Sequence, residues 1–403
     1  MNSEEIRSDS RNIILIFCVM TGLFWFSQYA YMPQLTKYAS QIGASYKTIG
    51  MISGAYGLSQ VLLRIPLGLY SDYLGKRKIF VVIGILMTIL SPTLVYFIPG
   101  DATLVVARFL SGVAAATWVN ITVMFSGYFN NAESTKAIGI INSANRFGQL
   151  AAFIVGGIAV AIYDIRAAFL ISALGGFIAL LFCMRLKDQP SLEGGTKFFD
   201  VKDIPKLYRN RRLLTISILG LISQFITFST IYSFTPLLAT KLGAQSVHLN
   251  LYNIAFMLPQ IFVAALAGTV IRDQFGERNT LTAGFAAVTL CCFLSPLVPH
   301  YLLFIPVMLI SGIGNALSFP LLMGIAIKDV ALEYKSSAMG FYQSVYAVGM
   351  TIGPILLGLI SQEYGLTSGF VFTGAVGVFA LTAIQMPALG IHNSVEYAMH
   401  KRI

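Results

Sequence analysis

Three arginines lie inside long apolar stretches of the sequence: Arg64, Arg108 and Arg146. Ionisable side chains at membrane depth are costly, and they are therefore candidates for function by default. The guanidinium group stays charged and presents a planar set of donors that suits a carboxylate or a phosphate. No Asp or Glu lies at comparable depth in these stretches. A binding site built from the arginines is predicted to favour an anionic or zwitterionic solute.

Arg146 belongs to a polar stripe. Asn142, Asn145 and Gln149 fall at spacings of three and four around it, so the four side chains share one face of a helix. A polar stripe on a membrane helix needs a protein partner or a water-filled cavity. We expect this face to line a solute path. For Arg64, near the end of its apolar stretch, capping of backbone carbonyls is an equal alternative.

Catalytic patterns are not evident in the chain. The four histidines lie at the ends of apolar stretches or in the tail, and no HExxH, GxSxG, GxxxxGKS or GxxxxGKT pattern occurs. The four cysteines lack CxxC spacing, which predicts neither a disulfide framework nor a zinc site. A membrane enzyme or a sensor is therefore disfavoured, and no cofactor or metal is expected.

The elements that must position the arginines are membrane helices. Hydrophobic residues make up 56% of the chain and charged residues 11%, with a mean hydropathy of +0.75, whereas soluble domains contain about 25% charged residues. Apolar runs long enough to cross roughly 30 Å of hydrocarbon recur from end to end, and the first has no cleavage site after it. Twelve spans are predicted, at residues 12–33, 47–71, 79–97, 102–127, 136–162, 167–184, 213–236, 247–271, 279–297, 301–327, 336–361 and 367–390.

The long polar stretch at residues 185–212 divides the spans into two groups of six. We predict a bundle at 1–184, a cytoplasmic linker at 185–212 and a second bundle at 213–403. With the N-terminus inside, twenty Lys and Arg residues fall on the cytoplasmic side, against four on the opposite side. This positive-inside bias places both termini and the linker in the cytoplasm.

The two groups of spans resemble each other. A shift of 200 residues places Gln60 on Gln260 and Gly68 on Gly268, and a shift of 201 places Asp72 on Asp273. The same shift of 201 brings further residues into register: Gly75 on Gly276, Arg77 on Arg278, Gly139 on Gly340, Gly148 on Gly349 and Gly157 on Gly358. Parallel six-span repeats are a frame that many transporters use, with the solute site between the halves.

The segment from Gly68 to Lys78 joins the second and third spans and reads GxxxDxxGKRK. Gly75 permits a tight turn, Asp72 can stabilise a helix N-terminus, and Lys76, Arg77 and Lys78 anchor the loop in the cytoplasm. The segment resembles the signature loop of the major facilitator superfamily. With the span count, the linker and the repeat, the resemblance covers essentially the whole chain. It implies an all-α membrane protein of twelve helices in two pseudo-symmetric six-helix bundles.

The corresponding loop of the second half keeps Asp273, Gly276 and Arg278 but has one extra residue after Gly268. The resemblance implies that Asp72 docks near Ser336 as part of a latch on the cytoplasmic side. The alternative is a role in topology and loop packing alone.

The fifth span resembles the antiporter signature of exporters in the superfamily. Its frame contains Gly139, Gly148, Gly156 and Gly157, but alanine and phenylalanine replace the usual Gly-Pro pair. The eleventh span has the same frame with the pair intact, at Gly340, Gly349, Gly353, Pro354 and Gly358. Such glycines permit close helix packing and the proline permits a bend. Ordinary packing, without bearing on direction, is nearly as good an interpretation.

Further site candidates follow from the resemblance, which implies that the first and fourth spans of each half line the cavity. Aromatic side chains there can form apolar walls, and amides can orient a solute. For any single one, interhelical packing is the better interpretation. These candidates are Trp25, Gln28, Tyr29, Trp118, Asn120, Gln224, Tyr232 and Asn315. Arg108 also begins an RxxxG pattern that the family associates with proton coupling.

The predicted function is secondary active export of a small amphipathic or anionic molecule across the cytoplasmic membrane, by alternating access and with the proton gradient as energy source. The absence of an acid deep in a span argues against proton coupling. Uptake, exchange or facilitated passage of an organic anion without protons is the alternative, and lipid translocation is a further one. The expected partners are the solute and the bilayer, with no nucleic acid, and the expected state is a monomer.

Overall fold

The computed structural model describes residues 3–129, 133–188, 210–266, 270–328, 330 and 335–386, and its regular elements are all helices. In the first half they are α1 (Ser3–Tyr29), η1 (Met32–Gln34), α2 (Leu35–Gln41), α3 (Tyr46–Leu74), α4 (Lys78–Phe97), α5 (Asp101–Ala116), α6 (Trp118–Ser126), α7 (Ser134–Ile162) and α8 (Ala167–Arg185). In the second half they are α10 (Arg211–Ser229), η4 (Thr230–Phe234), α11 (Thr235–Lys241), α12 (Ser246–Leu266), α13 (Arg272–Leu294), η6 (Ser295–Leu297), η7 (Tyr301–Leu303), α14 (Phe304–Lys328), α15 (Lys335–Tyr364) and α16 (Leu366–Gln385).

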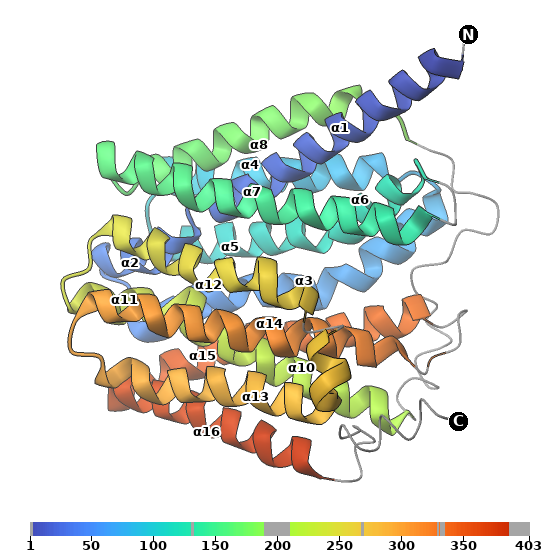
Figure 1. Ribbon diagram of the computed structural model, residues 1–403. Helices are drawn as coiled ribbons and strands as arrows, with labels where there is room; N and C mark the ends of the chain where they lie inside the picture. Colours follow the sequence, from blue (N-terminus) through green and yellow to red (C-terminus); the bar gives the residue numbers. More distant parts are fainter. Residues whose placement is uncertain are drawn as a thin grey trace, which may run out of the picture.

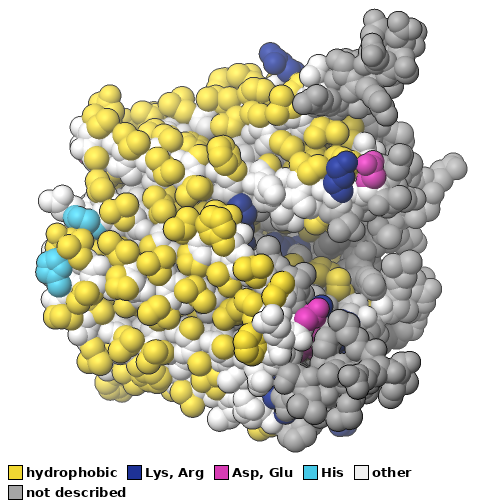
Figure 2. All heavy atoms as spheres, viewed as in Figure 1, with side chains coloured by type: hydrophobic (Ala, Val, Ile, Leu, Met, Phe, Trp, Pro, Cys, Tyr) yellow, Lys and Arg dark blue, Asp and Glu magenta, His cyan; other side chains and the backbone are white. Residues whose placement is uncertain are grey.

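Ten helical segments in the described ranges are long and apolar enough to cross a membrane. The helices α3, of 29 residues, and α12, of 21 residues, lie among them and complete the predicted twelve spans. Figure 1 shows α1 and α4 to α8 in one layer and α10 and α13 to α16 in another, with α3 and α12 where the two meet. Hydrophobic side chains cover most of the visible described surface, as expected for a protein solvated by lipid (Figure 2).

The first and seventh spans extend further than predicted. The sequence prediction ended them at residues 33 and 236, but after a break each continues as a seven-residue helix, α2 or α11. Each break holds a proline at the start of the next helical element, Pro33 or Pro236, where the missing N–H does least harm. Both short helices end before a glycine with positive φ, Gly43 at 95° and Gly243 at 93°. The shift of 200 residues thus extends to these two glycines. The segments before the short helices differ, because the first half has a 3-10 turn at Met32–Gln34 and the second has a π-helix at Thr230–Phe234.

The two ends of the molecule differ in how the halves meet. We call the end where α1 begins and α16 ends the terminal face, and the opposite end, near α2 and α11, the loop face (Figure 1). At the loop face the Gln34 amide donates to the Ser246 carbonyl at 2.9 Å, and the Lys37 ammonium donates to the Ser246 hydroxyl at 2.9 Å. The backbone N–H of Tyr46 donates to Gln362 Oε1 at 3.1 Å. These contacts join residues of the first half to residues of the second and close the loop face.

Several of the predicted glycines lie at close helix contacts. A Cβ added at Gly148 would collide with the carbonyl of Gly22, so α7 packs backbone to backbone against α1. In the second half, Gly349 and Gly353 make the corresponding approach of α15 to α10. Pro354 lies inside α15, and its carbonyl faces Gly50 of α3 across the boundary between the halves. Gly139, by contrast, has no neighbour within 4 Å of an added Cβ.

The signature loop turns where the sequence predicted. Gly75 ends α3 with φ 63°, and its repeat partner Gly276 interrupts α13 with φ 80°. These are conformations that glycine adopts without strain. The basic trio is less solvated than expected, since only Lys76 is exposed. Arg77 is buried and donates to Ser71 Oγ, and Lys78 donates to the carbonyls of Met184 in α8 and of Leu186, which follows α8. The predicted latch depends on the side chains of Asp72 and Ser336, which lie outside the described part. Gly268 also lies outside it.

Candidate functional site

An aromatic cluster lies where the two halves meet. The rings of Tyr29 and Tyr232 have centroids 6.3 Å apart, and Tyr56 stacks on Phe228 at 5.7 Å with an interplanar angle of 14°. In each pair the first residue comes from the first half and the second from α10 or η4. Tyr232 also contacts Phe256 at 5.8 Å. Two of the predicted wall residues, Tyr29 and Tyr232, therefore meet at the centre of the molecule.

Arg108 lies directly against this cluster. It is 2% exposed, and its guanidinium carbon lies 4.5 Å from the centre of the Tyr56 ring. One guanidinium nitrogen donates to the Tyr31 hydroxyl at 3.3 Å, and that hydroxyl shares a hydrogen bond of 2.5 Å with Ser111 Oγ. The side chain of Gln28 donates to the Ser111 carbonyl at 2.8 Å. A buried hydrogen-bonded network thus holds the cation in place, and no carboxylate of the described part takes part in it.

Arg146 lies on the polar face of α7 and is exposed. It is close enough to Tyr29 and Tyr232 to interact with both electrostatically. Asn142, also exposed, donates to the backbone of its own helix, and the Gln149 amide donates to Asn145 Oδ1 at 2.5 Å. Among the described residues Arg146 has no hydrogen bond or ion pair, so its donors face solvent. Figure 2 shows a hollow between the halves, with Lys or Arg side chains visible in it.

Arg64 joins the two halves instead of capping carbonyls. It is 4% exposed and donates to the Tyr346 hydroxyl of α15 at 2.9 Å and to Gln60 Oε1 at 2.6 Å. The alternative of carbonyl capping beside the loop is not seen in the described part, where Gln60 and Tyr346 provide acceptors one turn away and across the interface. Arg64 interacts electrostatically with Tyr56, as Arg108 does. The three arginines therefore surround one aromatic cluster.

The remaining candidates fall into two groups. Asn315 donates to Thr227 Oγ1 at 3.2 Å, and Gln224 is buried on α10, so both lie within the second half. Trp25 contacts Trp118 at a centroid distance of 5.3 Å. The indole nitrogen of Trp25 and both amide atoms of Asn120 are buried and have no hydrogen-bond partner among the described residues. Unpaired buried polar atoms are costly, so these two residues are the stronger candidates for contact with solute or water.

Sequence reasoning missed Tyr31, Tyr56, Phe228 and Tyr346, which touch the arginines or join the halves. Tyr31 and Tyr56 lie in the first two predicted spans, and an aromatic hydroxyl in an apolar segment was the available signal. Nothing in one sequence distinguishes them from aromatic residues that only pack.

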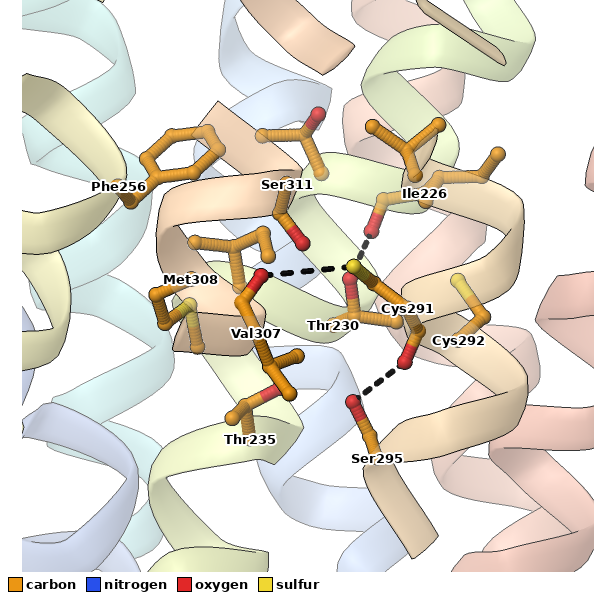
Figure 3. Close-up of a pocket in the computed structure, with 13 residues that line it drawn as sticks. Ile226, Thr230, Thr235, Phe256, Cys291, Cys292, Ser295, Val307, Met308 and Ser311 are labelled. Carbon is orange, nitrogen blue, oxygen red and sulfur yellow. Dashed lines mark hydrogen bonds between the residues drawn. The ribbon is translucent and has the colours of Figure 1, made fainter. Parts of the chain in front are cut away.

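The second half has a small cavity where the first half has its arginine network. By the shift of 200 residues, Arg108 corresponds to Met308, and Ser91 and Ser111 correspond to Cys291 and Ser311. Figure 3 shows Cys291 and Ser311 pointing into this cavity, with the Cys291 thiol donating to the Val307 carbonyl at 3.4 Å. The cavity has room for about one water molecule. The cationic site is therefore confined to one half of the repeat.

The charged residues of the second signature loop lie at the terminal face. Glu277 is 1% exposed and accepts from Lys328 Nζ at 2.8 Å, with Arg212 Nη2 at 3.8 Å. Asp273 pairs with Arg272 at 3.0 Å, and Arg278 is half-buried beside them in sequence. This cluster connects α13 to the start of α10 and the end of α14.

Taken together, the helices and the central site define a multi-pass membrane protein built as two similar bundles around a polar centre. The Major Facilitator Superfamily model matches residues 17–350 and 256–389, and the chain belongs to this family. Its relatives are transporters, which supports a transport role.

Two relatives with different descriptions are similar to this chain over most of its length. The chain is 25% identical to an uncharacterized MFS-type transporter, MJ1560, of Methanocaldococcus jannaschii, covering 92% of this chain and 97% of the relative. It is 22% identical to the class E tetracycline resistance protein of Escherichia coli, covering 88% and 89%.

The fold is shared with solved transporters. The nucleoside transporter NupG superposes with a TM-score of 0.77 at 14% identity, covering 95% of this chain and 100% of that one. A bacterial homologue of the human lysosomal transporter Spinster superposes with a TM-score of 0.78 at 14% identity, covering 93% and 96%.

Proposed function

We propose that this protein exports a small amphipathic anion across the cytoplasmic membrane by alternating access, with both termini in the cytoplasm. One observation supports this most: Arg108 is buried at the centre, between the halves, and neither it nor its neighbours Arg64 and Arg146 faces a carboxylate in the described part. The class E tetracycline resistance protein is a relative whose name connects the family to drug resistance.

The charge distribution supports an anionic solute. In the sequence no Asp or Glu occurs at residues 12–71, 102–132, 134–163, 210–272 or 278–328, which contain most of the spans. Two unit charges 4 Å apart interact with about 4 kcal/mol at an effective dielectric constant near 20. A carboxylate that reaches one arginine is therefore attracted, and the other two arginines add to the attraction. A cationic solute is repelled by the same field.

The conformation supports entry of the solute to the central site from the terminal face. Contacts among Gln34, Lys37 and Ser246 close the loop face, whereas Arg146 and Asn142 are exposed in the part of α7 nearer the terminal face. With the N-terminus in the cytoplasm, a solute enters from the cytoplasm, meets Arg146 and then reaches the aromatic cluster beside Arg108. Rocking of the halves would close the terminal face and open the loop face.

The energy source we propose is the proton gradient, as in the family's antiporters. The spans offer no carboxylate to carry the proton, so passive exchange or uptake of an organic anion is the competing function. Transport in proteoliposomes at a fixed solute gradient, with and without a pH gradient, separates the two. Proton coupling predicts a rate that depends on the pH gradient, and exchange predicts a rate that does not.

The test of the site is the substitution Arg146→Ala. We expect it to abolish transport of an organic anion while the protein remains folded and in the membrane, because the exposed guanidinium is lost from the entry path. The matched control is Arg166→Ala at the loop face, where the arginine lies at the start of α8, outside the aromatic cluster. Unchanged transport by Arg146→Ala, measured in vesicles with equal protein content, contradicts the proposed site.

A further inference from the structure

A second cavity lies against Arg108, between the halves. Its lining comes from α1, η1, α3 and α5 in the first half and from α10 in the second: Gln28, Tyr29, Met32, Tyr56, Arg108 and Phe228. The cavity has room for about one water molecule. The Nε atom of Arg108 is buried and has no hydrogen-bond partner in the described part of the protein. The Arg108 side chain is therefore 98% buried, borders a cavity and retains an N–H donor that is not used.

In the described part of the protein, no carboxylate contacts Arg108. The acid nearest in sequence, Asp101, is exposed at the first position of α5, seven residues earlier, about 10 Å along the helix. The Tyr31 hydroxyl and the face of the Tyr56 ring stabilise the cation in part. Burial of an ion without an opposite charge still carries a large desolvation penalty. The electrostatic influence of Arg64 and Arg146 on the same cluster of tyrosines makes the region more positive.

The second half provides an internal comparison. At the positions equivalent to Tyr31 and Arg108 it has Ile231 and Met308, which line the cavity of Figure 3 together with Cys291 and Ser311. This cavity is of the same size, but no Lys or Arg lines it. Its neutral polar groups suit a water molecule, whereas the cavity at Arg108 suits an anion.

We propose that Arg108 binds a chloride ion in the cavity formed with Gln28, Tyr29, Met32, Tyr56 and Phe228. Chloride is larger than a water molecule, so the unbranched Met32 side chain must move to admit it. The ion supplies the missing negative charge while no solute is bound. One ion binds per chain, since the equivalent cavity of the second half lacks a cation. Displacement of this ion by the anionic group of a solute rests on the proposed function, but the chloride site itself does not.

The experiment is thermal unfolding of the purified full-length protein in detergent, with sodium chloride replaced stepwise by sodium gluconate at constant ionic strength. A ligand that binds only the folded state stabilises it in proportion to the logarithm of its concentration above Kd. We expect the unfolding temperature to rise with chloride and with bromide, and Arg108→Gln to abolish that rise. Arg166→Gln, the same chemical change at the loop face, keeps the wild-type response.

Crystals of the unaltered protein grown in bromide give a second measurement that does not depend on a variant that folds. We expect one anomalous peak per chain, in contact with the Arg108 guanidinium, and none in the cavity beside Cys291. An unfolding temperature that is the same in chloride and gluconate, or a response retained by Arg108→Gln, overturns the inference, as does a bromide peak elsewhere only. If the protein transports an organic anion in chloride-free vesicles and its unfolding temperature does not respond to chloride, the chloride site is refuted and the proposed function stands. Chloride binding without organic-anion transport instead defeats the proposed function.

Discussion

Closure of the loop face depends on close contact between α3 and α15, and Gly54 lies at that contact. A Cβ added to Gly54 would lie 2.6 Å from the Thr351 carbonyl oxygen and 2.8 Å from Ile355 Cγ1. These separations are well below van der Waals contact, and one neighbour is backbone. Overpacking of this kind costs about 1–3 kcal/mol. Since 1.4 kcal/mol corresponds to about a factor of ten, Gly54→Ala should shift the population away from the closed loop face by roughly 5- to 150-fold.

The assay is the distance distribution between spin labels at Gln41 and Gln245, exposed residues of the two halves at the loop face. The labels are introduced as cysteines into a protein in which the four native cysteines are replaced by alanine. We expect Gly54→Ala to increase the fraction of long distances. Gly324→Ala is the matched control, because an added Cβ there has no neighbour within 4 Å. A distribution for Gly54→Ala that matches the control would refute the reasoning.

Two further predictions concern the terminal face. Asp72→Asn should slow turnover while solute affinity is largely kept, if the signature loop acts as a latch; full activity in a transport assay leaves the loop a topological role only. Glu277→Gln should lower the unfolding free energy by about 1–2 kcal/mol, because the buried carboxylate loses its charge-assisted bond with Lys328. The exposed pair of Glu133 with Lys136 provides the control for the second change, and Glu133→Gln should have almost no effect. Equal thermal stability of the two glutamine variants would contradict the role of Glu277.

The spans could be predicted because lipid imposes a length and a composition on every segment that crosses it. A proline alone, such as Pro33 or Pro236, does not show whether the helix stops there or continues after it. The polar residues Lys37 and Lys241 lie beyond the predicted ends of the first and seventh spans, because lipid favours apolar residues. In the structure the chain there is helical again, and Lys37 donates a hydrogen bond across the interface.

The candidate site could be predicted only in part. Arg108 and Arg146 were identified because a charge in an apolar stretch is conspicuous, and their meeting with Tyr29 and Tyr232 is a finding of the structure. The partner of Arg64, Tyr346, lies 282 residues further along the chain. No spacing in a single sequence predicts such a contact, because it depends on how the two halves dock. The shift of 200 residues predicted that the halves are alike. They differ at this site, where the second half has Met308 at the position equivalent to Arg108.

The most direct test of the central claim is a matched pair of ligands offered to the purified protein. An aromatic carboxylate and its neutral primary amide have nearly the same shape, and they differ in the charge that the arginines would recognise. Isothermal titration calorimetry should give at least about tenfold tighter binding for the carboxylate, a difference of about 1.4 kcal/mol. Arg108→Gln should remove most of that difference. Equal affinity for the two ligands, or tighter binding of the amide, would contradict an anion site at the centre of this transporter.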